Sequence, residues 1–181
     1  MPLVFVTVCY RLIKPRHGLS SKYPEFLLVA EIQAFTGASL GYLVASLSPD
    51  AEVATLLAPI FVFPMILLGG LYANVGAIPV EARWINKVNP IYYAFQAISI
   101  AEWADYGDIG GFPKVFATGN DVLDFFSLHE RSFEANLWRL GCVGLGLRSA
   151  VLLVLALAAG NPGLLPVVPE DAATANPVAA Q

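Results

Sequence analysis

Residues 53–80 read VATLLAPIFVFPMILLGGLYANVGAIPV, and no charged side chain occurs among them. A helix needs about 20 apolar residues to cross the hydrocarbon core of a bilayer. This run is longer than that, and it contains Pro59, Pro64, Gly69 and Gly70. Proline and glycine are costly in soluble helices and tolerated in membrane helices. The sequence therefore predicts an integral membrane protein.

The composition of the 181-residue chain agrees with this prediction. Hydrophobic residues make up 57% and charged residues 13%, whereas soluble domains have about 45–50% and about 25%. The mean hydropathy is +0.65. The formal net charge of −4 is small and dispersed, and no basic stripe with interleaved aromatic residues occurs, so we expect no nucleic-acid partner.

Helices are also predicted on either side of this run. Residues 2–13 are apolar but too short to span a bilayer alone. Residues 25–48, 51–73 and 134–160 predict three longer spans, the last with an apolar core from Leu137 to Ala159. We therefore expect an all-α integral membrane bundle of three to four spans.

Several helix boundaries are marked by residues that favour helix starts. Pro24 suits the first turn of the second helix, and Asp50 or Ser48 can cap the third. Asp121 can cap a short helix that runs through Ser127. These residues predict where the chain turns between spans.

Three other segments have a different character. Residues 78–103 mix prolines and charges with tryptophan and tyrosine, which predicts two short helices at the membrane interface, beginning at Pro79 and Pro90. Residues 104–133 are polar and rich in glycine, which predicts a loop outside the membrane. Residues 161–181 are rich in alanine, proline and valine, and we expect a disordered tail.

Small residues recur at every fourth position in the second predicted helix. Gly37, Gly41 and Ala45 form a small-xxx-small stripe, which lets two membrane helices approach closely. The alternative is that the stripe only reflects background glycine and alanine content.

One face of the predicted helix over residues 51–73 is formed by Pro59, Val62, Phe63, Ile66 and Gly70. Their spacing of three and four residues places them on the same side. Spacing alone does not tell whether this face meets lipid or a cavity.

Arg148 interrupts the last predicted span. A charge near mid-membrane costs about 2.5–3.5 kcal/mol on insertion scales and needs a partner or an interface. Glu31 and helix carbonyls are candidate partners, and snorkelling to the lipid headgroups is the alternative.

The sequence contains no pattern for enzymatic chemistry. No phosphate-binding loop, serine-hydrolase elbow or zinc motif occurs, and the two histidines, His17 and His129, are far apart in the sequence. The cysteines Cys9 and Cys142 lie in apolar segments and give no support to a disulfide or a metal site. We therefore expect no catalytic and no metal-ligating residues in this chain.

Four groups of residues carry a family resemblance. They are GASLG at 37–41 with Ser46–Ser48; VATLL at 53–57 with GGLYAN at 69–74 and Ile78-Pro79; Trp84-Ile85 with NPIYYAFQA at 89–97 and Glu102-Trp103; and Gly119 with Asp121–Leu123, Trp138 and Gly146–Arg148. In this order and spacing they resemble the ABC-2 type transmembrane domain of ABC transporters of the G subfamily. These are half-transporters that export lipids, sterols, pigments and xenobiotics.

The resemblance implies a topology. Residues 1–103 would belong to the transmembrane domain, with the end of the third of six spans at 2–13, the fourth at 25–48, the fifth at 51–73 and re-entrant helices at 78–103. Residues 104–133 would be an extracellular loop, 134–160 the sixth span and 161–181 a cytoplasmic tail. The first two spans and the nucleotide-binding domain have no counterpart, so the resemblance implies a C-terminal fragment, a truncated gene model or a degenerate copy.

The resemblance also implies site residues and partners. Two half-transporters, identical or different, would pair in a plasma or internal membrane. A substrate cavity at their axis would be lined by Pro59, Val62, Phe63 and Ile66, and an exit gate would be formed by Leu71 and Tyr72. The substrate would be a hydrophobic small molecule. The chain itself would hold no cofactor, since ATP and Mg²⁺ would bind in the nucleotide-binding domain of the full-length transporter.

Two questions stay open at this level. The first loop and its flanks carry four positive charges, at Arg11, Lys14, Arg16 and Lys22. Such an excess favours a cytoplasmic position for the loop. The family instead places this loop outside. A non-transporting membrane scaffold or accessory protein, derived from such a transporter, is the alternative function.

Overall fold

The computed structural model describes residues 2–13, 22–104, 107–109, 116–128 and 132–160. In these residues all regular structure is helical, apart from one isolated β-bridge between Asp108 and Thr118. This agrees with the predicted all-α fold. Residues 14–21 of the predicted first loop at 14–23 lie outside the described residues, as does the predicted tail at 161–181, and Tyr23 already belongs to the next helix.

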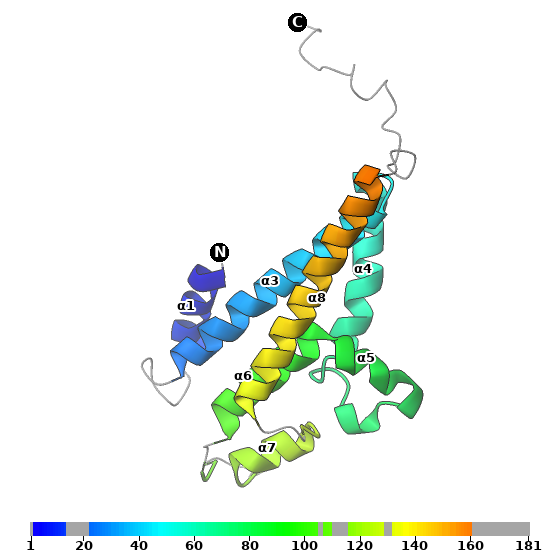
Figure 1. The fold of residues 1–181 in the computed structure, drawn as a ribbon. Helices are drawn as coiled ribbons and strands as arrows, with labels where there is room; N and C mark the ends of the chain where they lie inside the picture. Colours follow the sequence, from blue (N-terminus) through cyan, green and yellow to red (C-terminus); the bar gives the residue numbers. More distant parts are fainter. Residues whose placement is uncertain (1, 14–21, 105–106, 110–115, 129–131, 161–181) are drawn as a thin grey trace, which may run out of the picture.

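Two long helices form the centre of the fold. α3 (Tyr23–Leu47, 25 residues) and α8 (Phe133–Gly160, 28 residues) run in the same direction and lie side by side (Figure 1). Within the described part of the chain, these two helices are long and apolar enough to cross a membrane. α8 begins one turn before Leu137, because the Ser132 hydroxyl accepts a hydrogen bond from the Ala135 N–H at 3.2 Å.

α4 (Ala51–Leu67, 17 residues) runs back from the end of α3 (Figure 1). The prediction that this helix continues to residue 73 is wrong. Gly69 and Gly70 form a tight turn, and Gly70 has a φ of 98°, which favours glycine. A Cβ on Gly69 would lie 2.9 Å from Ile91 Cγ2. The glycine pair therefore turns the chain against the next helices, and α4 spans only about 26 Å.

Four short elements follow the glycine turn. They are η1 (Val75–Ala77), η2 (Val80–Ala82), α5 (Arg83–Val88) and α6 (Pro90–Trp103). The two short helices predicted in residues 78–103 are present as α5 and α6. Pro90 occupies the first turn of α6, as predicted, whereas Pro79 precedes the 3-10 turn η2.

α6 packs against both α3 and α8 and supplies three of the five buried residues of the cluster that the three helices share. Tyr93, Ala94 and Ala97 of α6 contact Val29 of α3 and Leu140 of α8. The sequence predicted that this segment lies at the membrane interface, but α6 has eight buried residues and is part of the bundle interior.

α7 (Gly119–Phe125) lies in the predicted outer loop, below the ends of α6 and α8 in Figure 1. The sequence assigned its cap to Asp121, but the cap is Thr118, and Asp121 completes a capping box from the third helical position. The Thr118 N–H donates to Asp121 Oδ2 at 2.8 Å. This bond and a second from Ala117 hold the pKa of Asp121 below its usual value. The helix ends at Phe125, two residues before the predicted end at Ser127.

α1 (Pro2–Ile13) packs against the start of α3 through aromatic side chains. The Tyr10 ring makes edge contacts with Tyr23 and Phe26, each at 5.4 Å between ring centroids. The Thr7 and Tyr23 hydroxyls share a hydrogen bond of 2.7 Å.

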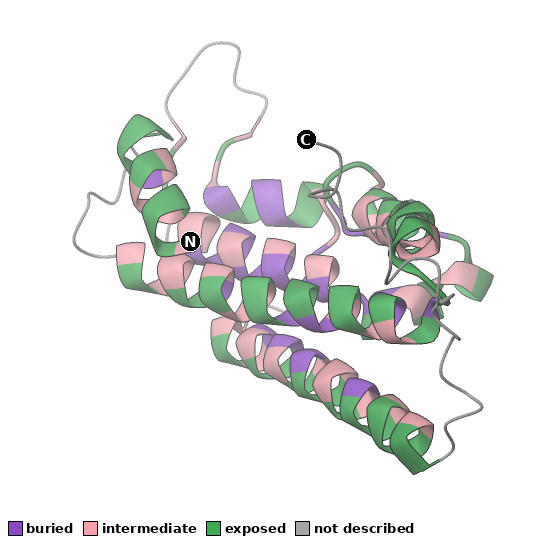
Figure 2. Ribbon diagram, turned by 90° about the horizontal axis from the view of Figure 1, so that it is seen from above, coloured by how far each residue is buried: buried purple, intermediate pink, exposed green. Residues whose placement is uncertain are grey.

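The distribution of polar and apolar side chains is that of a membrane protein. Polar side chains such as Thr36, Ser39 and Gln96 are fully buried between helices, whereas Phe5 and Leu152 are among many large apolar side chains on the outside. Figure 2 shows buried positions where helices face one another and exposed positions on their outer sides. Lipid-facing helices place small and polar residues at their contacts and apolar residues outside.

Candidate functional site

The predicted cavity face of α4 is exposed at Pro59 and Phe63 and half-buried at Val62 and Ile66. Pro59, Val62 and Phe63 line one open groove together with Ala54, Thr55 and Ala58. Ile66 lies one turn further along, outside the groove. The Phe63 side chain is 63% exposed, and α4 has no buried residue. This face is free to meet lipid, a ligand or a partner.

Polar contacts fix the position of α4. At its start the Asp50 side chain accepts a hydrogen bond from the Val53 N–H at 2.8 Å, as predicted for a cap. Near its end the Met65 carbonyl accepts one from Asn89 Nδ2, also at 2.8 Å. The bond from Asn89 therefore ties the end of α4 to the start of α6.

Asn89 is a structural residue that the sequence reasoning missed. It is fully buried, and its Oδ1 also accepts a hydrogen bond from the Ile91 N–H at 3.0 Å, which caps α6. The signal in the sequence is Asn followed by Pro, a cap residue before a residue suited to the first helical position. One side chain thus joins the end of α4 to the start of α6.

The predicted gate residues lie beyond the end of α4. Leu71 and Tyr72 follow the glycine turn, and their side chains are 58% and 70% exposed. They stand at the same end of α4 as Ile66, but they are not part of the helix.

The glycine stripe of α3 also faces outward. A Cβ built on Gly37 or Gly41 meets no atom within 4 Å, and Ala45 is exposed. No helix of the described chain packs on these glycines. Close packing of α3 occurs instead through Thr36, whose Oγ1 would lie 2.5 Å from a Cβ on Gly144 of α8. The stripe remains a prediction for contact with a partner helix.

Arg148 lies against aromatic rings of α3, and Glu31 is not brought to it. The guanidinium carbon is 5.0 Å from the Tyr42 ring centroid and 5.7 Å from that of Phe35. Glu31 is exposed, and the ion pair recorded among the described residues joins Lys22 to Glu25. Cation–π contacts of this kind contribute about 0.5–2 kcal/mol, so the rings partly offset the charge.

This arrangement gives a testable prediction for Arg148. Tyr42→Leu is expected to destabilise the chain by about 1 kcal/mol more when Arg148 is present than in the Arg148→Leu background. The measurement is the free energy of unfolding in mixed detergent micelles, followed by circular dichroism. The control is the pair Glu31→Gln and Arg148→Leu. The loss of unfolding free energy in the double variant should equal the sum of the losses in the two single variants to within about 0.5 kcal/mol. A larger coupling for Glu31 than for Tyr42 would contradict the observed contact.

A separate apolar cavity of about 750 Å³ lies between α1, α3 and α6. Its wall includes the aromatic side chains of Phe5, Phe26, Phe95 and Trp103. The sequence reasoning did not find it, because its residues come from three distant segments. Apolar walls of this kind suit lipid chains and hydrophobic ligands.

The described residues include no group of three His, Cys, Asp or Glu side chains that could hold a metal ion. Cys9 and Cys142 are free thiols.

Comparison with known proteins identifies relatives. Residues 1–103 match the family model described as ABC-2 type transporter. The chain is 31% identical over 105 residues to protein white of Drosophila melanogaster. The aligned segment covers 58% of this chain and 15% of white. The chain is 29% identical over 154 residues to protein scarlet of the same organism, covering 80% of this chain and 22% of scarlet. It is 27% identical over 171 residues to ABC transporter G family member 1 of Dictyostelium discoideum, covering 89% and 21%. The chain thus spans about a fifth or less of the length of these relatives.

Proposed function

The chain belongs to the ABC-2 type transporter family, and we propose that it forms the membrane-spanning part of an ATP-driven exporter for lipids, sterols or other apolar molecules. The relatives named as G-family transporters support this proposal. ATP and Mg²⁺ would bind a nucleotide-binding domain outside these residues, so this chain provides the path and not the hydrolysis.

The exposed groove on α4 is the observation that carries the proposal. A helix inside a self-sufficient bundle buries one side, yet α4 buries none of its residues. Its groove is apolar, and it presents Pro59, Val62 and Phe63. An apolar face held in a fixed orientation suits a substrate path shared with a second half-transporter.

In the proposed arrangement, equivalent α4 helices of two half-transporters face one another across an axis. Phe63 contacts the substrate with its ring, and Ile66 extends the same face toward the outer end. Leu71 and Tyr72, just beyond the glycine turn, form the exit gate. The polar loop around α7 lies outside the membrane, and the end of α8 lies at the cytoplasmic side. In Figure 1 α3 and α8 run parallel and α4 runs back from the end of α3, so α7 and the end of α8 lie at opposite ends of the bundle, which supports this order.

Two phenylalanines of α4 allow a matched test. Phe63 lies in the groove, whereas Phe61 is exposed on a different side of the same helix. In a transporter that joins this chain to its nucleotide-binding domain, Phe63→Ala is expected to reduce substrate-stimulated ATP hydrolysis by about ten-fold, as loss of a buried aromatic contact does. Basal hydrolysis and surface expression should remain close to those of the parent.

Phe61→Ala is the control and should leave stimulation unchanged. The proposal fails if both variants respond to substrate like the parent while they are expressed normally. Equal losses in both variants would also count against it, because a general weakening of α4 would then explain the result.

A further inference from the structure

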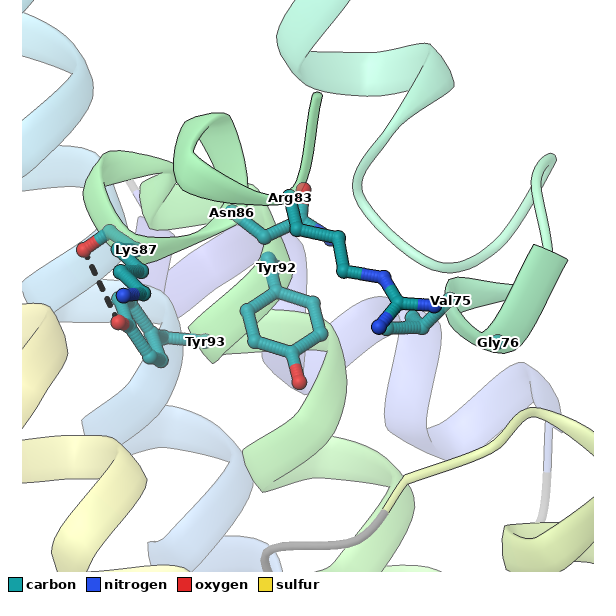
Figure 3. Close-up of a pocket in the computed structure, with 7 residues that line it drawn as sticks. All are labelled: Val75, Gly76, Arg83, Asn86, Lys87, Tyr92 and Tyr93. Atoms are coloured by element: carbon teal, nitrogen blue, oxygen red, sulfur yellow. Dashed lines mark hydrogen bonds between the residues drawn. The ribbon is translucent and has the colours of Figure 1, made fainter. Parts of the chain in front are cut away.

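A small pocket with a mixed apolar and polar wall lies between η1, α5 and the first turn of α6 (Figure 3). It encloses about 260 Å³, and its lining includes Val75, Arg83, Asn86, Lys87, Tyr92 and Tyr93. Two of its lining residues are cations, and within the described residues none of them is a carboxylate. The pocket is therefore electropositive.

Asn86 is the buried amide residue in the wall of this pocket. Its residue is 6% exposed, and both Oδ1 and Nδ2 are shielded from solvent without a hydrogen-bond partner among the described residues. A buried polar group left without a partner costs about 1–3 kcal/mol. A ligand that displaces the side chains covering this amide finds two N–H donors and one carbonyl acceptor unpaired.

Arg83 and Lys87 flank Asn86 on the same face of α5. Positions i, i+3 and i+4 of a helix lie on one side, and Arg83, Asn86 and Lys87 have this spacing. Arg83 Nε donates to the Ile78 carbonyl at 3.1 Å, which anchors a guanidinium that has further N–H donors. Figure 3 shows Arg83 extending toward Val75, with the Tyr92 ring between it and Lys87.

Tyr93 holds the backbone of α5 in place at Lys87. Tyr93 Oη donates a hydrogen bond to the Lys87 carbonyl at 3.0 Å (Figure 3). Because Tyr93 is buried in the core shared by α3, α6 and α8, this bond fixes the end of α5 to the bundle. The pocket is therefore built on the bundle core and not on a loose surface segment.

We propose that this pocket binds a phosphate-type oxyanion, either the phosphate of a lipid headgroup or a soluble phosphate ester. Guanidinium and ammonium groups form charge-assisted hydrogen bonds with phosphate oxygens. Asn86 Nδ2 donates to the same anion, and Asn86 Oδ1 accepts from a hydroxyl or amine next to the phosphate. The pocket lies apart from the groove on α4, so the inference does not rest on the export proposed above.

Three probes distinguish the two sources of phosphate. The full chain in detergent is tested with phosphatidylglycerol, with diacylglycerol of the same acyl chains, and with soluble glycerol 3-phosphate. Lipids are measured by native mass spectrometry, and the soluble ester by equilibrium dialysis with a radioactive label. About ten-fold stronger retention of phosphatidylglycerol than of diacylglycerol indicates a lipid phosphate. Binding of glycerol 3-phosphate indicates a soluble ester. Equal retention of the two lipids, with no binding of the soluble ester, overturns the proposal.

Variants locate the binding at this pocket. Arg83→Gln and Lys87→Gln are each expected to weaken phosphate binding about ten-fold. Arg11→Gln removes the same charge from the exposed end of α1, and it should have no effect. If Arg11→Gln weakens binding as much as the pocket variants, the attraction is only that of net charge and the proposal fails.

Asn86 is tested with two variants, because one of them could unfold α5. Asn86→Leu removes the amide, and Asn86→Asp keeps its shape but adds a negative charge beside Arg83 and Lys87. Both are expected to lose phosphate binding, while circular dichroism verifies that the helices remain. Parent-like binding in the folded Asn86→Asp variant overturns the proposal.

Discussion

Gly144→Val is expected to separate α3 from α8 and to reduce the free energy of unfolding by about 2–3 kcal/mol. A Cβ at this position would lie 2.5 Å from Thr36 Oγ1 and 3.3 Å from Phe35 Cδ1. Thr36 is fully buried, and its hydroxyl donates to the Ile32 carbonyl at 2.8 Å. The side chain therefore has little room to move, and the helices must shift apart. The measurement is denaturation in mixed micelles, followed by circular dichroism.

Gly146→Val is the matched control on the same helix. Gly146 is exposed, and a Cβ there meets no atom within 4 Å. Both substitutions exchange glycine for a β-branched residue, so they change helix propensity equally. The difference between them isolates the contact with Thr36. Thr36→Ala in the Gly144→Val background should recover part of the loss. Equal stability of the two valine variants would show that α3 and α8 do not approach closely at Gly144.

The sequence predicts that helices can pack closely at small residues, but it does not tell which small residues make the contact. A small-residue stripe shows that a close approach is possible, but not which stripe is used. Gly37 and Gly41 have the recurrent spacing, yet the contact within this chain uses Gly144. The choice depends on which face of α3 is turned toward α8, and a single sequence does not contain that rotation.

The end of α4 shows a similar limit. The uncharged run continues well past Leu67, so hydropathy alone extended the helix to residue 73. The turn at Gly69 and Gly70 lies so close to α6 that a Cβ on Gly69 would be 2.9 Å from Ile91 Cγ2 and one on Gly70 would be 3.0 Å from Phe95 Cδ1. These partners are more than twenty residues away in the chain, and a local pattern does not reveal them. Local signals predict more: the cap of α4 is Asp50, one of the two predicted candidates, and Pro90 begins α6 as predicted, because caps act within one turn.

The two candidate sites differ in how far the sequence could predict them. The α4 face follows from helical spacing, since Pro59, Val62 and Phe63 lie on one short helix. The pocket beside α5 is lined by Val75, Arg83 and Tyr92, which come from three different elements, η1, α5 and α6. Its two cations, Arg83 and Lys87, have helical spacing on α5, but folding brings the rest of the wall to them. Pairing of Arg148 with the rings of Phe35 and Tyr42 is equally a result of the parallel packing of α3 and α8.

Asn89→Ala is expected to reduce the free energy of unfolding by about 2–3 kcal/mol, because it breaks two hydrogen bonds of a fully buried side chain. Loss of the cap on Ile91 accounts for about 1 kcal/mol. The remainder comes from the Met65 carbonyl, which loses its bond from Asn89 Nδ2 near the end of α4. The amide protons near that end should also exchange faster with solvent, since the tie between α4 and α6 is gone.

Two further variants separate the cap from the tie. Asn89→Ser keeps an acceptor for the Ile91 N–H but has no donor that reaches Met65, so it should retain about 1 kcal/mol relative to Asn89→Ala. Asp50→Ala removes a cap of α4 that lies in an exposed position and makes no second contact through its side chain in the described bonds. It should cost about 1 kcal/mol and leave exchange near Met65 unchanged. If Asn89→Ala costs no more than Asp50→Ala, the bond across the glycine turn does not hold α4 in place. The fixed orientation of the α4 face would then need another cause.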